Sequence, residues 1–190
     1  MFAVKTISTT MPVDFYVSTL SKKELDEMAQ NMWDDFPWED HTTNRRELFC
    51  SEASQSYTYG SEKFARTYHA VPAPLLLNEV KHKIEDLLND RFEYCFVNGY
   101  ASEKEHLGYH ADDSSSIDHT RPIVVASFGA ERAIWVKPIG GSHDTVEKFS
   151  LPSGSLFVMK PGMQHTHLHR IPKNPAPCGF RVSLTFRGAK

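Results

Sequence analysis

The stretch that decides the fold is Arg181-Val182-Ser183-Leu184-Thr185-Phe186-Arg187, close to the end of the chain. Side chains of a β-strand alternate between its two faces, so the odd-numbered residues here form a polar face and the even-numbered residues an apolar one. A strand with an apolar outer side and arginines on its inner side suits a ligand-holding β-barrel or sandwich better than a dry core. The chain is therefore expected to fold around a polar cavity.

A candidate metal site precedes this strand. His110 and Asp112 are two residues apart, so on a strand their side chains would converge on one ion, and His169 supplies a second imidazole. Two histidines and one carboxylate on a rigid scaffold hold a non-haem Fe(II) on one face and leave positions open for substrate and oxygen. A lone His-x-Asp pair arises easily by chance, so the prediction depends on its combination with the arginines.

The two arginines predict a site for a dicarboxylate. The planar guanidinium groups of Arg181 and Arg187 match carboxylates bidentately, and both lie on the same face of their strand. In the stretch 92–100, Asn98 and Tyr100 share a face and are placed to donate hydrogen bonds to a bound carboxylate. Iron beside a dicarboxylate site is typical of dioxygenases that use 2-oxoglutarate as cosubstrate together with O2.

Four blocks of the sequence resemble the AlkB family of Fe(II)/2-oxoglutarate dioxygenases. They are Asn98-Gly-Tyr100, His110-Ala-Asp112-Asp113, Ser127-Phe-Gly-Ala-Glu-Arg132, and His169-Arg-Ile-Pro172-Lys followed by the stretch 181–187. Looser matches at Arg46-Glu-Leu and Tyr57-Thr-Tyr59 extend the resemblance over residues 46–187. The order of the blocks, with His169 standing 12 residues before Arg181, makes the resemblance specific.

The resemblance implies a role for each candidate residue. The iron ligands would be His110, Asp112 and His169. Two groups of side chains would hold 2-oxoglutarate, one at the end that chelates iron (Arg187, Asn98, Ser183) and one at the distal carboxylate (Arg181, Tyr100).

The chain departs from the family pattern at two positions. Ser183 stands where the family usually has Asn, so this hydrogen bond to the cosubstrate is expected to be weaker or bridged by water. Ser114 stands where relatives commonly have an acidic residue near the target base, which leaves the base preference open. Asp113 either contacts the amino group of the target base or is a solvated turn aspartate.

Residues 33–72 are expected to form the nucleotide-recognition lid that relatives carry. Aromatic side chains are frequent here and lack a clean periodicity: Trp33, Phe36, Trp38, Phe49, Tyr57, Tyr59, Phe64 and Tyr68. Stacking on an aromatic face stabilises an unpaired base by about 1–3 kcal/mol. Most of these rings are expected to pack the lid against the barrel, and Tyr57 and Tyr59 are the candidates for substrate binding.

The pattern of the remaining chain predicts two helices followed by short strands. Ser21-Lys-Lys-Glu24 is a capping box that should open a helix running to about Trp33. Pro74 is expected as the first residue of a second helix with an apolar stripe formed by Leu76, Leu77, Val80, Ile84, Leu87 and Leu88. Strands are expected at 92–100, 107–111, 122–129, 132–137, 145–151, 154–160 and 180–187.

These elements indicate a mainly β fold with helices, namely a double-stranded β-helix, or jelly roll, buttressed by N-terminal helices. Residues 1–190 are expected to form a single dioxygenase domain with its β-helix core at 91–187.

The other histidines are less suited to bind metal. His165, His167 and His169 are expected to share a face, but only His169 has the following Ile-Pro and the interval to Arg181. His165 is expected beside the site or in a loop, and His167 stands where relatives often carry tryptophan. Three further histidines, His106, His119 and His143, are expected at the surface or in loops.

Composition favours an intracellular enzyme. Three cysteines, Cys50, Cys95 and Cys178, are odd in number and widely spaced, so they are expected to be reduced thiols. The N-terminus lacks the features of a secretory signal, and no apolar run is long enough to cross a membrane. We expect a cytoplasmic monomer, or a nuclear one in a eukaryote, without membrane association.

The predicted activity is oxidative demethylation of an N-methylated base such as 1-methyladenine or 3-methylcytosine, as the resemblance implies. A net charge of −3 offers little phosphate neutralisation to offset the extrusion of a paired base, so single-stranded nucleic acid is the expected partner. Two alternatives stay open. One is the same chemistry on a modified nucleotide or a methylated protein side chain, and the other is a catalytically silent nucleic-acid-binding module, which the intact ligands disfavour.

Overall fold

A computed structural model describes residues 2–5, 7, 9–39, 45–52, 56–59 and 66–190 of the chain. Its centre is a seven-stranded antiparallel sheet whose strands lie in the order β1-β2-β11-β8-β13-β6-β3. In that order their bounds are Phe2–Val4, Val13–Ser18, Ser155–Met159, Ile123–Gly129, Arg181–Arg187, Tyr94–Tyr100 and Arg46–Ser51.

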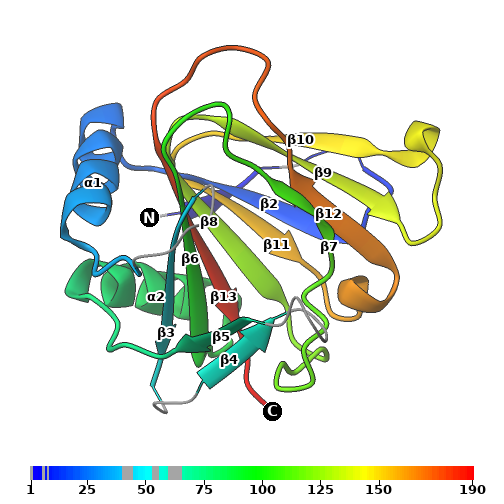
Figure 1. The fold of residues 1–190 in the computed structure, drawn as a ribbon, viewed down its shortest axis with the longest axis horizontal. Coiled ribbons are helices and arrows are strands. Elements are labelled where there is room, and N and C mark those ends of the chain that lie inside the picture. The colour runs from blue at the N-terminus through cyan, green and yellow to red at the C-terminus, as the bar shows by residue number, and fades with distance from the viewer. Residues whose placement is uncertain (1, 6, 8, 40–44, 53–55, 60–65) are drawn as a thin grey trace.

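A four-stranded antiparallel sheet in the order β10-β9-β12-β7 faces the larger one (Figure 1). Its strands are Glu147–Leu151, Arg132–Pro138, His167–Ile171 and Leu107–His110. A hairpin of β4, Ser56–Tyr59, and β5, Arg66–His69, forms a third small sheet beside β3. The short 3-10 helices η2, His143–Thr145, and η3, Met163–His165, precede β10 and β12.

Apolar side chains from both large sheets meet in one core between them, for example Phe157 of β11, Val125 of β8 and Ile134 of β9. Two antiparallel sheets that enclose a shared core are the jelly roll that the sequence predicted. Every strand predicted after residue 91 is present within two residues of its expected bounds. The start of β10 shifts to Glu147 because the residues before it form η2.

The helix α1, Lys22–Asp35, begins where the capping box predicted it. The Ser21 hydroxyl accepts from the Glu24 backbone N–H at 3.3 Å, and the Glu24 carboxylate accepts from the Ser21 N–H at 2.8 Å. Both contacts satisfy helix-start donors that have no partner inside the helix. The buried face of α1 packs against the outer side of the seven-stranded sheet.

The helix α2, Leu75–Leu88, also packs on that outer side. Leu77, Val80 and Ile84 are buried at helical spacing, as predicted. Two details of the prediction are wrong. Pro74 is the residue before the helix and not its first residue, and Leu87, at the end of the helix, is 37% exposed.

The strand β13 has the two faces that its sequence predicted. Val182, Leu184 and Phe186 belong to the core shared with the helices, so the even-numbered face is the outer one. The odd-numbered residues therefore point between the two sheets, where Ser183, Thr185 and Arg187 line a cavity. Within the described part of the chain, no helix is long and apolar enough to cross a membrane.

Candidate active site

The structure brings the three candidate metal ligands together at one end of the four-stranded sheet. His110 is the last residue of β7, Asp112 follows it, and His169 lies in β12 directly opposite His110. One ligand atom from each of the three residues lies within 4.8 Å of the others. The two imidazole rings are 4.2 Å apart between centroids. This spacing is compatible with one shared ion.

A β-bulge in β7 places His110 at this point. His169 pairs with His110 and Ile171 pairs with Leu107, so three steps on β7 oppose two steps on β12. Both Leu107 and His110 consequently line the cavity, which strict alternation would not allow. The sequence reasoning placed His110 and Asp112 on one regular strand, whereas β7 ends at His110 and Asp112 lies in the loop beyond it.

Hydrogen bonds orient the ligand atoms. His110 Nδ1 donates to the carbonyl of Gly108 at 2.9 Å, which leaves Nε2 as the lone-pair nitrogen, 3.7 Å from Asp112 Oδ1. The backbone N–H of Asp112 donates to Gln164 Oε1 at 2.9 Å. The loop that carries the carboxylate is thus tied to η3.

Two buried atoms of the cluster fit a metal ion. Asp112 Oδ1 accepts from Arg187 Nη2 at 2.9 Å, but Asp112 Oδ2 is buried and has no hydrogen-bond partner among the described residues. The same holds for His169 Nδ1. A buried polar atom without a partner is costly, and a bound cation would satisfy the carboxylate oxygen.

The protonation states also suit a cation. Burial, together with the neighbouring His110 and Arg187 and against the opposing charge of Asp112, lowers the pKa of His169 to about 3. Burial would raise the pKa of Asp112, but Arg187 and the two histidines outweigh it and bring the pKa to about 2. Burial likewise lowers the pKa of His110. At neutral pH the site therefore offers two neutral imidazoles and one carboxylate.

Behind the cluster lies a cavity with about 360 Å³ of empty space. It is lined by the three candidate ligands, by apolar residues, and by polar side chains of the seven-stranded sheet, namely Asn98, Tyr100, Ser183, Thr185 and Arg187. Arg187 is at the end next to Asp112. A small polar molecule that enters this cavity would meet the cluster and Arg187 together.

Arg181 is completely buried at the opposite end of β13. Its guanidinium stands 5.3 Å from the ring of Tyr100, which lines the cavity, and Nη2 donates to Ser127 Oγ at 2.8 Å. Nε and Nη1 have no hydrogen-bond partner within the described part of the chain. Burial lowers the pKa of Arg181 to about 10, so it remains charged at neutral pH. Two unsatisfied buried N–H groups fit a carboxylate ligand.

Arg132 is a structural residue of the site that the sequence reasoning left without a role. It is buried and stands 5.4 Å from the Tyr100 ring, on which Arg181 also stacks. Its guanidinium donates to the backbone carbonyls of Ser102, Glu105 and Pro172 at 2.6–3.1 Å. Arg132 thereby joins the loops that follow β6 and β12.

A second cavity, with about 330 Å³ of empty space, adjoins the first and is called the front cavity below. Both cavities are lined by His110, Asp112 and Arg187. Arg45, Tyr68 and Phe96 line it together with residues of the site. The Arg45 guanidinium donates to Asn98 Oδ1 at 2.8 Å and forms an ion pair of 2.5 Å with Glu47. Of this front wall, the sequence predicted only that Tyr68 belongs to the lid, and it gave Arg45 and Phe96 no role at the site.

Glu47 holds the front wall to the small hairpin. Its carboxylate is fully buried and accepts from Arg66 Nη1 at 2.8 Å and from the Tyr68 hydroxyl at 3.0 Å. Burial and the Glu47 charge raise the pKa of Tyr68, so this hydroxyl stays protonated. A glutamate directly before the apolar run Leu48-Phe49-Cys50 was the available signal, because a charge there must be paired.

Several other predicted residues lie apart from the cavities or outside the description. Asp113 is exposed and lines neither cavity. Tyr57 and Tyr59 belong to β4 through their backbone, but their side chains are outside the described part, as is Phe64. His165 lies in η3, with its ring 4.8 Å from that of His119, so the expectation that it shares the face of His169 is wrong.

Comparisons with known proteins agree with this arrangement. The family model described as "2OG-Fe(II) oxygenase superfamily" matches residues 13–187. Human "Alpha-ketoglutarate-dependent dioxygenase alkB homolog 3" is 29% identical over 188 residues, which cover 92% of this chain and 65% of the human protein. Mouse "DNA oxidative demethylase ALKBH2" is 29% identical over 153 residues, covering 77% of this chain and 62% of that protein. The chain thus spans slightly less than two thirds of these relatives.

A solved structure, "The structure of OsALKBH1", superimposes with a TM-score of 0.64 at 13% identity, covering 98% of this chain and 100% of that chain. At this identity the likeness concerns the fold, and it confirms the jelly roll. The chain therefore belongs to the 2OG-Fe(II) oxygenase superfamily, and within it to the AlkB type.

Proposed function

We propose that this protein is an Fe(II)- and 2-oxoglutarate-dependent dioxygenase that removes methyl groups from N-methylated bases in single-stranded DNA or RNA. One observation carries the proposal. Two histidines and a carboxylate converge beside a polar cavity whose back strand holds two inward arginines. Residues 1–190 would act as one domain, with 91–187 as its core and 33–72 as the lid over the substrate.

The metal would be held by His110, Asp112 and His169, with Asp112 Oδ2 as the carboxylate donor. Their combination of imidazole and carboxylate ligands suits Fe(II). Iron with 2-oxoglutarate and O2 would supply the oxidising chemistry that hydroxylates the N-methyl carbon, after which formaldehyde leaves. The chain itself supplies binding, orientation and a dry surrounding.

The polar side chains of β6 and β13 would hold the cosubstrate. Arg187, beside Asp112, would pair with the carboxylate end nearest the metal, assisted by Asn98 and Ser183. Arg181 and Tyr100 would bind the distal carboxylate, for which Arg181 has two buried N–H groups to offer. Apolar residues such as Val125 and Ile134 in the same cavity exclude water around the reacting groups.

The front cavity would receive the base. Tyr68 and Phe96 give it aromatic walls, and Arg45 adds hydrogen-bond donors at the entrance. Tyr57 and Tyr59 of the β4 strand would contribute stacking. The printed name of the mouse relative, a DNA oxidative demethylase, supports a nucleic-acid substrate. A net charge of −3 favours bases that are already unpaired, since extruding a paired base costs a few kcal/mol.

The test is formaldehyde release from a panel of single-stranded DNA and RNA oligonucleotides that carry 1-methyladenine or 3-methylcytosine, with duplexes for comparison. We expect release from single strands, dependent on added Fe(II) and 2-oxoglutarate. If 2-oxoglutarate is consumed but no oligonucleotide releases formaldehyde, the substrate is a modified nucleotide or a methylated protein side chain. If 2-oxoglutarate is not consumed at all, the chain is a silent binding module and the proposal is wrong.

A further inference from the structure

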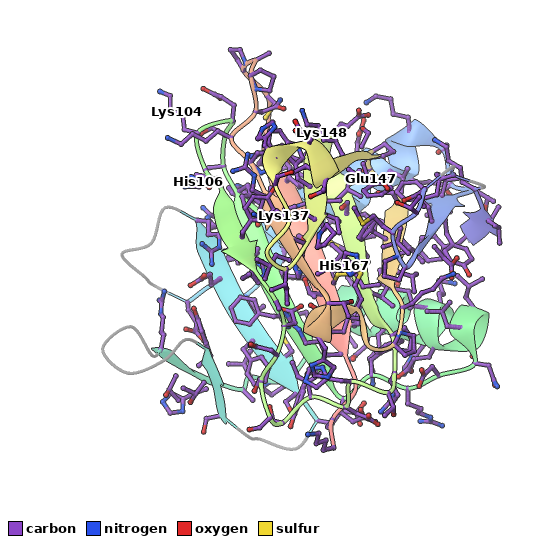
Figure 2. All side chains as sticks on the ribbon, turned by 90° about the vertical axis from the view of Figure 1, so that its right-hand side faces the viewer. Lys104, His106, Lys137, Glu147, Lys148 and His167 are labelled. Atoms are coloured by element: carbon purple, nitrogen blue, oxygen red, sulfur yellow. The ribbon has the colours of Figure 1, made fainter. Side chains whose placement is uncertain are left out.

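The outer face of the four-stranded sheet carries a row of cations stacked on aromatic rings. The Arg170 guanidinium lies 4.1 Å from the ring centroid of Trp135 and 4.9 Å from that of Tyr109. Lys148 lies over the Trp135 ring at 4.4 Å, and Lys137 lies over the Tyr109 ring at 4.7 Å. Figure 2 looks at this side of the molecule, with Lys137 and Lys148 labelled. None of these residues lines the cavities of the active site.

Strand register creates the row. Arg170 of β12 pairs with Trp135 of β9, which pairs with Lys148 of β10. Tyr109 continues it on β7. Four neighbouring strands at about 4.8 Å spacing give the row a length of roughly 14 Å. The helices α1 and α2 both pack on the other sheet, so neither of them covers this face (Figure 1).

The cations of the row are not neutralised. Among the described residues, Arg170, Lys137 and Lys148 form no ion pair with a carboxylate. The carboxylates of Glu147 and Glu131, on β10 and just before β9, accept hydrogen bonds from hydroxyl groups instead. Arg170 Nε is buried without a hydrogen-bond partner in the described part. Three cations on one face, none of them paired with a carboxylate of the described segments, contrast with the net charge of −3 for the whole chain.

We propose that this row binds the phosphate backbone of the single-stranded nucleic acid whose methylated base occupies the active site. This inference rests on the proposed function. Tyr109 directly precedes His110 on β7, the edge strand of the four-stranded sheet, and faces the opposite side, so the row begins at the edge that carries the metal cluster and leads away across the outer face. The rings already hold cations over them, so the face offers positive charge rather than free stacking surfaces. Stacking also holds the Arg170 guanidinium in place, which lowers the entropy cost of pairing it with a phosphate.

The row explains how an acidic protein can bind a polyanion. Contacts to phosphates depend on local cations and carry no base information, so they would lengthen the binding site without changing which base is repaired. A trinucleotide that fills only the active site would not reach the outer strands. Longer strands would therefore bind more tightly, and more salt-dependently, than short ones.

The experiment compares the double variant Lys137→Ala/Lys148→Ala with the matched double variant Lys22→Ala/Lys23→Ala. Both remove two lysine charges, and the second pair is on α1, which covers the other sheet. The probe is an unmodified, fluorescently labelled oligothymidylate, and its Kd is measured by anisotropy over a range of KCl concentrations. We expect the slope of log Kd against log salt to fall by about 1.4 for the row variant, at about 0.7 per phosphate contact. The α1 variant should keep the wild-type slope.

Kinetics give a second readout. With methylated oligonucleotides, the row variant should show a raised KM for long strands and an unchanged KM for a methylated trinucleotide, with kcat preserved. Equal slopes for the two double variants, or an equal KM rise for long and short substrates, would overturn the inference. Retention of oligothymidylate binding together with loss of polyglutamate binding would mean that the face binds an acidic protein instead, which also overturns it.

The oligothymidylate needs no turnover, so the two proposals fail separately. If wild-type protein releases no formaldehyde but the row variant still loses salt-dependent binding, the demethylase proposal is wrong and the binding face stands. Arg170→Gln provides an independent variant, because it removes the stacked charge while it keeps a polar side chain. It should reduce the slope by about 0.7.

Discussion

Arg187 and Arg181 stand at the two ends of the inner face of β13, and their surroundings differ in charge. Arg187 is paired with the buried carboxylate of Asp112 at 2.9 Å. Arg181 is equally buried, but its polar contacts are a hydroxyl and an aromatic ring, and two of its N–H groups have no partner among the described residues. One arginine is thus neutralised by the protein and the other awaits a ligand. Arg187 is therefore held beside the metal ligands by an ion pair within the protein, whereas Arg181 keeps two buried N–H groups for a bound anion.

The largest expected effect is the loss of activity when the metal ligands next to Arg187 are removed. His110→Ala or Asp112→Ala should abolish 2-oxoglutarate decarboxylation, because the remaining two ligands do not fix the ion. Circular dichroism should show an intact fold, since the core between the sheets does not depend on the metal. His165→Ala, at an exposed position in η3, is the matched control and should keep activity. Full turnover in the Asp112 variant would exclude this ligand set.

Lysine substitutions compare the two ends as cosubstrate ligands. Arg187→Lys and Arg181→Lys keep the charge but lose the bidentate geometry, so the affinity for 2-oxoglutarate should fall about 10- to 100-fold, as expected from about 1.5–3 kcal/mol per charge-assisted hydrogen bond. Isothermal titration calorimetry with Mn(II) in place of Fe(II) measures this affinity without turnover. An unchanged affinity for either variant would remove that arginine from the cosubstrate site.

Methionine substitutions should separate the two ends by the sign of their effect on stability. Arg181→Met removes a buried cation that has no counter-charge, so without 2-oxoglutarate the protein should become more stable, by about 1–4 kcal/mol. Arg187→Met strands the Asp112 carboxylate and should destabilise the fold by about 3–5 kcal/mol. Urea unfolding at neutral pH gives both values. A loss of stability in both variants would mean that Arg181 stabilises the ligand-free fold, which contradicts its assignment as a group kept for the cosubstrate.

Lowering the pH should reduce the stability of the fold through His169, next to Arg187, and not through Arg181. The pKa of His169 is about 3 in the fold and near 6.5 when unfolded, so both states are neutral above pH 6.5 and the unfolded state takes up the proton first below it. Stability should therefore decline by about 1.4 kcal/mol per pH unit between about 6 and 4 through this residue. His169→Gln should show a shallower decline in the same window. The free-energy cost of burying the charged Arg181 does not change between pH 6 and 4, because its pKa is about 10.

The alternation of β13 was readable from its sequence because hydrophobic and polar residues occupy strictly opposite faces. The start of α1 was also predictable, because the residues of the capping box, Ser21 and Glu24, are only three positions apart in the sequence. Glu47 could not be assigned a partner, because Arg66 and Tyr68 reach it from a hairpin that is distant in sequence. Strand β12 was missed since its histidines and arginine, which serve the site and the outer face, hide the apolar alternation.

The bulge in β7 makes the tautomer of His110 insensitive to substitution at position 108. The bulge lies between Leu107 and His110, and within it the carbonyl of Gly108 fixes which nitrogen of His110 is protonated. Every amino acid has that carbonyl, and a Cβ added at Gly108 would meet no atom within 4 Å. Substitutions at position 108 should therefore preserve the tautomer of His110, and only a deletion or insertion in this strand would change it. The tautomer of His110 thus depends on the number of residues in this part of the strand and not on which residue stands at position 108.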